Sequence, residues 1–360
     1  MGDNLKRIDI IAPKLSGHGG TETVLSLLLS NKLILKNFKF NLMLVDSLKS
    51  DKWLKNVSKN VLIKENKKEN RIFFLIKHLI ISKADAVVVL GPRIVVLAKL
   101  IRIFFNKKYR IISWIHFTLF HQKMMNVSYL KYADYHLAIS SQMVSQFKKI
   151  GIKKEKVYVV YNPVVIPKMK NHEFRKIKRD GFINICYIGR IMLDGQKNLR
   201  LLFDSLKQLT ITQKKIVVLD VWGDGEIDKV KDYIEFLDFK DRLIVNWHGW
   251  VTNPWESIYN IDLLVLTSKF EGFGMALTEA ISRGVPVVAT DYPVGARDII
   301  IPGLNGELAS YNSTSVKNAI IKVLGYPLDT RKEIVNSINK FEIRKYSQNF
   351  CDALLKIMRR

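Results

Sequence analysis

The 360-residue sequence has little cysteine and no long uncharged apolar run. Its two cysteines, Cys186 and Cys351, form no metal-binding pattern, which favours structural thiols in a reducing compartment. A membrane-spanning helix needs about 18 or more apolar residues, and cations interrupt the most hydrophobic region before that length. These cations are Lys77, Lys83, Arg93, Lys99 and Arg102. Residues 1–7 show no signal-peptide core, so we expect no export by a signal of the chain's own.

The sequence also lacks a convincing G-x-G-x-x-G loop with an acidic residue about twenty positions later, which argues against a nicotinamide-dependent oxidoreductase. Acidic residues are scarce in the first half. Residues 1–180 carry 35 lysines and arginines against 12 aspartates and glutamates, whereas residues 181–360 carry 23 against 21. The basic half is therefore expected to face an anionic partner.

Two stretches in the basic half, residues 71–83 and 95–110, mix large apolar residues with cations at helical spacing. This pattern suits helices that lie on an anionic membrane surface. It also suits helices that face the protein core and expose a basic side to solvent. No aromatic-basic readout motif accompanies the charge, so we expect no nucleic-acid partner.

The length predicts two domains of ordinary size, each with an ample core. Buried-strand patterns alternate with helical segments in both halves, which indicates parallel α/β sheets. The expected strands are residues 7–12, 40–45, 86–90, 111–117, 183–188, 215–221, 243–249, 262–266 and 285–289. Residues 167–180 are polar and charged and are interpreted as the interdomain linker.

The most informative segment is residues 269–290, a glycine turn and a helix between two buried strands. In parallel sheets, ligands bind at the carboxyl ends of the strands, where Glu271 lies. Glu279 follows eight residues later, a helical distance of about 12 Å. Glycosidase carboxylates lie about 5–9.5 Å apart, so this pair suits the two ends of one long ligand better. The alternative is two ordinary surface glutamates.

Backbone N–H groups lie between the two glutamates, at Phe273, Gly274 and Met275. They are expected at a helix N-terminus, where phosphate or sugar oxygens are readily held. Earlier in the chain, a glycine-rich loop at residues 16–20 leads into an apolar helix from Thr21, with Thr21 or a neighbour as its cap. That loop suits phosphate binding or a plain tight turn.

Three further side chains are placed near strand ends. His116 is expected to end the strand at 111–117, where it is either a satisfied structural histidine or a ligand contact. Arg190 and Lys197 follow the strand at 183–188 and would neutralise a diphosphate and the charge that grows on a leaving phosphate. Lys197 follows Arg190 by seven positions, which a turn at Gly195 can accommodate, and a solvent-facing Lys197 is the alternative.

Six segments carry distinctive motifs: K-F-E-G-F-G-M-A-L-T-E at 269–279, W-I-H-F at 114–117 with H-Q-K at 121–123, Y-A-D-Y-H-L-A-I-S-S at 132–141, Y-I-G-R at 187–190, D-G-Q-K-N at 194–198 and P-W-E at 254–256. Together they resemble family 4 retaining glycosyltransferases of the GT-B fold, and bacterial lipopolysaccharide core 1,6-galactosyltransferases most of all. The resemblance covers nearly the full length.

It implies an α/β GT-B fold, with two Rossmann-like parallel-sheet domains facing a central cleft. The expected domains are an acceptor-binding N-terminal domain at 1–166, a nucleotide-sugar-binding domain at 167–345, and a helix at 346–360 that crosses back to the first domain. The segment at 157–164, which contains an Asn-Pro turn, would end the first domain.

The resemblance also implies a role for each site residue. His116 and Glu271 would act at the donor sugar, His116 in sugar binding and transition-state support. Gly19, Gly20, Arg190, Lys197 and Gly225 would lie at the diphosphate. The N–H groups of Phe273, Gly274 and Met275 would contact sugar and diphosphate, Glu279 the ribose, and the backbone near Trp250 the nucleobase. Around Trp250, aromatic packing alone is the alternative.

The implied reaction is transfer of a hexose, galactose or glucose, from a UDP-sugar to a lipopolysaccharide core or similar membrane-bound glycan, with retention of configuration. No cofactor and no metal are implied, because cations and helix-end N–H groups can act on the diphosphate. The protein would be cytoplasmic and peripheral on the inner face of the bacterial plasma membrane. Alternatives are a GT-B epimerase or hydrolase, an N-acetylglucosaminyltransferase acting on a capsule or teichoic-type acceptor, and a noncatalytic membrane-surface binding protein.

Overall fold

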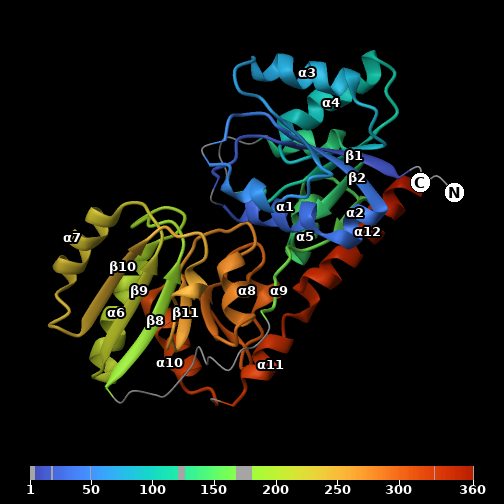
Figure 1. Ribbon diagram of the computed structural model, residues 1–360. Helices are drawn as coiled ribbons and strands as arrows, with labels where there is room; N and C mark the ends of the chain where they lie inside the picture. The colour runs from blue at the N-terminus through green and yellow to red at the C-terminus, as the bar shows by residue number, and fades with distance from the viewer. Residues whose placement is uncertain are drawn as a thin grey trace. The chain divides into compact units, whose positions relative to one another are not determined.

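The computed structural model describes residues 5–17, 19–48, 50–120, 126–167, 181–327 and 329–359. The chain divides into two compact units (Figure 1): unit 1 comprises Met1–Pro163 and Ile343–Arg360, and unit 2 comprises Val164–Glu342. Most of the expected linker, residues 168–180, lies outside the described residues, as do His18 of the glycine loop and the H-Q-K motif at 121–123.

Unit 1 is built on a seven-stranded sheet in the order β3-β2-β1-β4-β5-β6-β7, in which all neighbouring strands are parallel. Its strands are β1 (Lys6–Ala12), β2 (Phe38–Leu44), β3 (Leu62–Glu65), β4 (Ala86–Val89), β5 (Arg110–Trp114), β6 (Tyr135–Ala138) and β7 (Val157–Val159). Every residue of β4 is buried, as its continuous Ala-Val-Val-Val run requires for a strand with both faces covered.

The helices of unit 1 come from both ends of the chain. They are α1 (Gly20–Ser30), α2 (Lys32–Asn37), α3 (Arg71–Ile81), α4 (Pro92–Phe104), α5 (Ser141–Lys149) and α12 (Ile343–Arg359), with short 3-10 helices η1 (Lys52–Asn56), η2 (Val127–Tyr132) and η3 (Lys154–Lys156). Helix α12 contacts α2, and its Phe350 ring lies 5.4 Å from the ring of Trp114. The last helix therefore completes the core of the first unit.

Unit 2 has a six-stranded parallel sheet in the order β10-β9-β8-β11-β12-β13. Its strands are β8 (Phe182–Ile188), β9 (Ile216–Trp222), β10 (Leu243–Gly249), β11 (Leu263–Leu266), β12 (Val287–Thr290) and β13 (Gly306–Ala309). Its helices are α6 (Leu199–Gln213), α7 (Ile227–Leu237), α8 (Met275–Ile281), α9 (Ala296–Ile299), α10 (Ser313–Leu324) and α11 (Arg331–Asn336), with η4 (Pro254–Glu256) and η5 (Asn339–Phe341). The prediction of two parallel α/β sheets is confirmed.

Some expected element boundaries are wrong. Strand β5 pairs with β6 only as far as Trp114, so His116 lies in the loop beyond the strand and not at its last position. Helix α1 begins at Gly20, and its N-cap is Gly19 and not Thr21, with no side chain capping the helix. Helix α4 ends at Phe104, because Asn106 adopts a positive φ of 45° and Arg110 already starts β5.

Among the helices in the described ranges, none combines the length and the apolarity that crossing a bilayer requires.

Candidate functional site

The carboxyl ends of three neighbouring strands organise the candidate site in unit 2. Strand β11 pairs with β8 on one side and with β12 on the other, and all are parallel. Arg190 follows β8 and Glu271 follows β11, so the two side chains emerge at the same edge of the sheet. This is the edge at which open parallel sheets bind their ligands.

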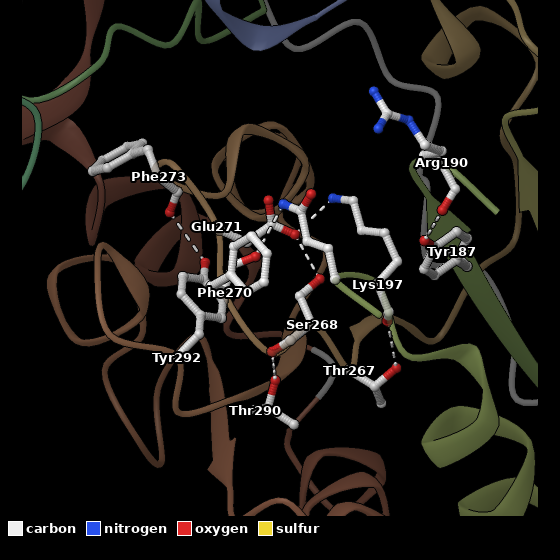
Figure 2. A network of polar contacts seen from close by, with 11 residues as sticks. Tyr187, Arg190, Lys197, Thr267, Ser268, Phe270, Glu271, Phe273, Thr290 and Tyr292 are labelled. Atoms are coloured by element: carbon white, nitrogen blue, oxygen red, sulfur yellow. Dashed lines mark hydrogen bonds and ion pairs between the residues drawn. The ribbon is translucent and has the colours of Figure 1, made fainter. Parts of the chain in front are cut away.

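Glu271 and Lys197 form an ion pair at this edge. The Lys197 Nζ lies 2.6 Å from the Glu271 Oε1, and the side chains are only 15% and 10% exposed. Ser268 donates its hydroxyl to the same carboxylate oxygen at 2.5 Å, and Thr290 donates to the backbone oxygen of Ser268 at 2.6 Å. Figure 2 shows the Lys197 and Ser268 side chains converging on Glu271, and Thr290 hydrogen-bonded to Ser268. The alternative of a solvent-facing Lys197 is therefore wrong.

The loop before Lys197 is held against the turn that carries Glu271. The Lys269 N–H donates to the Gln196 carbonyl at 2.8 Å, and the Gln196 side-chain amide donates to the Phe270 carbonyl at 3.0 Å. Gly195 has a φ of 84°, so the expected turn at this glycine accommodates the spacing between the two cations. These bonds fix the position of the Lys197 backbone.

Arg190 presents its guanidinium to solvent. Its backbone oxygen accepts a hydrogen bond from the Tyr187 hydroxyl at 2.7 Å, while its side chain is exposed. In Figure 2 the guanidinium extends away from that bond. Burial raises the pKa of Tyr187 well above its usual value, so the phenol stays a neutral donor. The backbone is anchored, and the cation can reach a ligand.

Gly225 lies against the loop that carries Arg190. A Cβ at this position would come within 2.0 Å of the Ile191 carbonyl oxygen, and its φ is 151°. The Ile191 N–H donates to the Asp224 carbonyl at 2.8 Å. Gly225 is therefore required for close contact between two loops of the site, and direct contact with phosphate stays a prediction.

The backbone turn at residues 273–275 is also tightly packed. Tyr292 donates its hydroxyl to the Phe273 carbonyl at 3.0 Å, and a Cβ on Gly274 would lie 2.2 Å from that hydroxyl. The Phe273 ring is buried against Phe341, with ring centroids 5.3 Å apart. Only the backbone of Phe273 is thus placed to meet a ligand, together with the start of α8 at Met275.

Glu279 has partners different from those of Glu271. Its Oε2 accepts a hydrogen bond from the Trp255 indole N–H at 3.0 Å, and the Arg283 guanidinium lies 4.8 Å from the centroid of the Trp255 ring. Burial raises the pKa of Glu279, against the opposite effects of Trp255 and Arg283. Because Glu271 precedes α8, the eight-position separation of the glutamates is not all helical, and the 12 Å estimate does not apply.

Trp250 is half-buried, and its backbone N–H donates to the Asp224 Oδ1 at 3.1 Å. Nearby in sequence, the His248 ring stacks on Trp222 with centroids 3.9 Å apart, and its Nε2 lies 2.8 Å from the Asp220 carboxylate. The strand end is thus well ordered by polar and aromatic contacts. A nucleobase contact at Trp250 stays a prediction.

In unit 1, the glycine loop is organised by Glu22, which the sequence patterns did not identify. The Glu22 Oε1 accepts from the Ser16 hydroxyl at 2.9 Å and from the Gly17 N–H at 2.6 Å. A Cβ on Gly19 would lie 2.7 Å from the other Glu22 oxygen. Gly19 therefore lets the carboxylate approach, and Gly20 starts α1. Phosphate binding by this loop stays a prediction.

His116 is buried and its ring lies 4.4 Å from that of Trp114. Neither of its ring nitrogens has a hydrogen-bond partner among the described residues. Burial lowers the pKa of His116 to about 3, so the imidazole is neutral at physiological pH. By contrast, the Nδ1 of His136 lies 2.7 Å from the Ser113 hydroxyl. His116 thus has hydrogen-bonding capacity that the described residues do not use.

Acid is expected to destabilise the fold through His116. Its pKa of about 3 in the folded protein lies below the usual unfolded value, so the unfolded state takes up the proton first as the pH falls. The stability that neutral His116 contributes is fully present above about pH 6.5 and decreases as the pH falls toward 3. Between pH 7 and 5 the free energy of unfolding falls by about 2 kcal/mol. Urea unfolding at both pH values should show that the free energy of unfolding falls less for His116→Gln than for the wild type. An identical loss in both proteins would contradict the assignment.

Residues 168–341 match the family of glycosyl transferases group 1. The chain is 33% identical to a lipopolysaccharide 1,6-galactosyltransferase of Salmonella typhimurium (strain LT2), over 97% of this chain and 98% of that protein. It is 38% identical to a protein of the same description from Escherichia coli (strain K12), over 55% of this chain and 54% of that protein. The solved structure of a lipopolysaccharide outer core galactosyltransferase matches with a TM-score of 0.80 and 31% identity, over 97% of this chain and 99% of that chain.

Proposed function

Because the chain belongs to the glycosyl transferases group 1, we propose that it moves galactose or glucose from a UDP-sugar to a lipopolysaccharide core or similar membrane-bound glycan. The GT-B fold and the glycosyltransferase class expected from the sequence are confirmed by the nearly full-length matches. The donor, the acceptor and the residue roles are parts of the proposal.

The ion pair between Lys197 and Glu271 is the observation that carries the proposal. It holds a cation and a carboxylate at the ligand-binding edge of the sheet, the edge at which the exposed Arg190 also emerges. A lysine ammonium has three donors, so Lys197 can contact a phosphate oxygen while it remains near Glu271. The Glu271 carboxylate would accept hydrogen bonds from donor sugar hydroxyls. One site would thus hold both halves of a nucleotide sugar.

In the proposed reaction, the bond between the sugar C1 and the diphosphate oxygen breaks as the acceptor hydroxyl oxygen bonds to C1 on the same face. The hydroxyl proton passes to the leaving phosphate. Arg190 and Lys197 would stabilise the negative charge that develops on the departing UDP. No separate protein nucleophile is needed in this scheme, and configuration is retained.

Unit 1 would contribute Gly19, Gly20 and His116. The uncapped N-terminus of α1 has N–H groups suited to an anion. The neutral His116 ring, whose nitrogens have no partner among the described residues, would hydrogen-bond to the donor sugar. It would support the transition state as a neutral group and not as an imidazolium.

We also propose that unit 1 meets the anionic membrane surface through α3 and α4. The two helices contact each other, and neither contains an aspartate or a glutamate. They and the residue after α4 expose large apolar side chains, namely Ile72, Phe73, Ile81, Leu100, Ile103, Phe104 and Phe105. Lys83, Arg93 and Lys108 are exposed at or near the helix ends. Apolar side chains among cations suit an anionic lipid surface.

Replacing Phe73 and Phe104 with serine is expected to weaken binding to anionic phosphatidylglycerol vesicles about a hundredfold, from the loss of about 1.4 kcal/mol for each partly inserted ring. Phe73 and Phe104 are 60% and 78% exposed, so the fold should tolerate both changes. Vesicle flotation measures the binding. The matched control is Phe236→Ser on α7, where the phenylalanine is 80% exposed in unit 2. Equal loss in the control would contradict the assignment of this surface.

The proposed function is tested by incubating the purified protein with UDP-hexoses, with and without lipopolysaccharide core acceptors in detergent. UDP release and acceptor mass are followed, and a chelator is added in parallel. We expect release that depends on the acceptor, a mass gain of one hexose, and no effect of the chelator. UDP release without a mass gain would favour a hydrolase or epimerase, and no binding of any UDP-sugar would overturn the proposal.

Among the described residues, no three or more histidine, cysteine, aspartate or glutamate side chains are grouped so that they could hold a metal ion. Metal independence nevertheless stays a prediction, which the chelator arm tests.

A further inference from the structure

Trp255, Glu279 and Arg283 form a compact cluster in unit 2. Trp255 lies in η4 and is 5% exposed, whereas Glu279 and Arg283 are on or just after α8. The indole N–H donates to the Glu279 Oε2 at 3.0 Å, and the Arg283 guanidinium lies over the indole ring at 4.8 Å. The Arg283 side chain also donates to the Glu279 backbone carbonyl at 3.0 Å. The N–H edge of the Trp255 indole therefore contacts Glu279, and its face contacts Arg283.

This arrangement restricts the Glu279 side chain. A carboxylate can rotate and exchange its oxygens unless one of them is held. The indole is rigid and has a single donor, so its bond to Oε2 directs the other oxygen, Oε1, to a defined position. The cation over the ring face limits movement of the indole itself. Glu279 is thus prepared to accept hydrogen bonds with Oε1.

We propose that Trp255 is a positioning residue for nucleotide binding, because it holds Glu279 in the orientation that accepts the ribose hydroxyls. This inference rests on the proposed function, in which Glu279 contacts the ribose. It adds Trp255, which lies outside the glycine turn and α8, to the residues proposed to act in nucleotide binding. It also predicts that the indole N–H, and not the bulk of the ring, is what nucleotide binding requires.

Trp255→Phe removes the N–H and keeps an aromatic ring at this position. We expect this variant to bind UDP about tenfold more weakly by calorimetry, which corresponds to about 1.4 kcal/mol. The KM for the UDP-sugar should rise by a similar factor, while kcat stays within about twofold, since the lost contact is equal in ground and transition states. A merely structural role would lower kcat and the melting temperature without this selective rise in KM.

Trp53→Phe is the matched control. Trp53 is a buried tryptophan of unit 1, and its indole N–H has no hydrogen-bond partner among the described residues. The same change there should leave UDP binding unaltered. A second comparison uses Glu279→Gln: if Trp255 acts through Glu279, adding Trp255→Phe to Glu279→Gln should cost less than about twofold further.

Additive losses in that double variant, or wild-type UDP affinity in Trp255→Phe, would overturn the inference. Should Trp255→Phe not fold, the indole N–H resonances of ¹⁵N-labelled protein give the answer. The resonance displaced by Glu279→Gln should also shift when UDP is added to the wild type, and its indifference to UDP would overturn the inference. The proposed function fails separately, if the wild type itself binds no UDP.

Discussion

Lys197→Met is expected to lower kcat about a thousandfold, because the variant loses a cation that would stabilise the departing diphosphate. Methionine keeps most of the length and apolar volume of the lysine stem. The substitution therefore tests the charge more than the packing. Steady-state kinetics with the UDP-sugar and the acceptor measure the effect, and a kcat within about tenfold of the wild type would contradict this role.

The same substitution leaves Glu271 without its ion-pair partner. Both side chains are largely buried, so the unpaired carboxylate should lower the free energy of unfolding by about 3 kcal/mol. The double variant Lys197→Met/Glu271→Gln has no such charge, and its stability should return toward that of the wild type. Its activity should not return. Urea unfolding and kinetics on the same three proteins thus separate the structural effect from the catalytic one.

Glu271→Gln alone is expected to lower kcat/KM about a hundredfold. The amide replaces a carboxylate that would accept two charged hydrogen bonds from sugar hydroxyls, each worth about 1.5 kcal/mol. The bond from Ser268, now 2.5 Å long, can persist to the amide oxygen, so the side chain should keep its position. Kinetics and a melting curve together measure the change.

Glu279→Gln provides the contrast for Glu271→Gln. In our proposal Glu279 contacts the nucleotide and not the reacting sugar, so its variant should mainly raise the KM for the donor, whereas Glu271→Gln should also lower kcat. The UDP affinity of Glu271→Gln should stay close to that of the wild type. If the two variants had the same kinetic pattern, the assignment of sugar and ribose to different carboxylates would be wrong.

Much of the fold could be predicted from the sequence. Short apolar runs such as Ala86–Val89 and Leu263–Leu266 alternate with amphipathic segments, and this order specifies parallel sheets. Element ends were predicted less well. Strand β5 stops two residues before His116, because its pairing with β6 ends at Trp114, and pairing depends on a strand that lies elsewhere in the sequence.

The candidate site was predicted only in part, because some of its contacts depend on residues that lie elsewhere in the sequence. The types and order of Arg190, Lys197, Glu271 and Glu279 are local features that a motif reveals. The contact of Ser268 with Glu271 involves a common residue type, and the P-W-E motif at 254–256 contains Trp255 but does not show that its indole binds Glu279. The role of Glu22 was also missed, since nothing in its local sequence shows that it accepts hydrogen bonds from Ser16 and Gly17.

The sequence by itself determined the succession of strands and helices, the basic character of the first half and the family to which the chain belongs. These follow from local hydrophobic periodicity, composition and motif spacing. Only the tertiary structure decided that Lys197 pairs with Glu271, that Trp255 holds Glu279, and that burial keeps His116 neutral. Each of these depends on distances between residues far apart in the chain and on exclusion of water, which folding alone brings about.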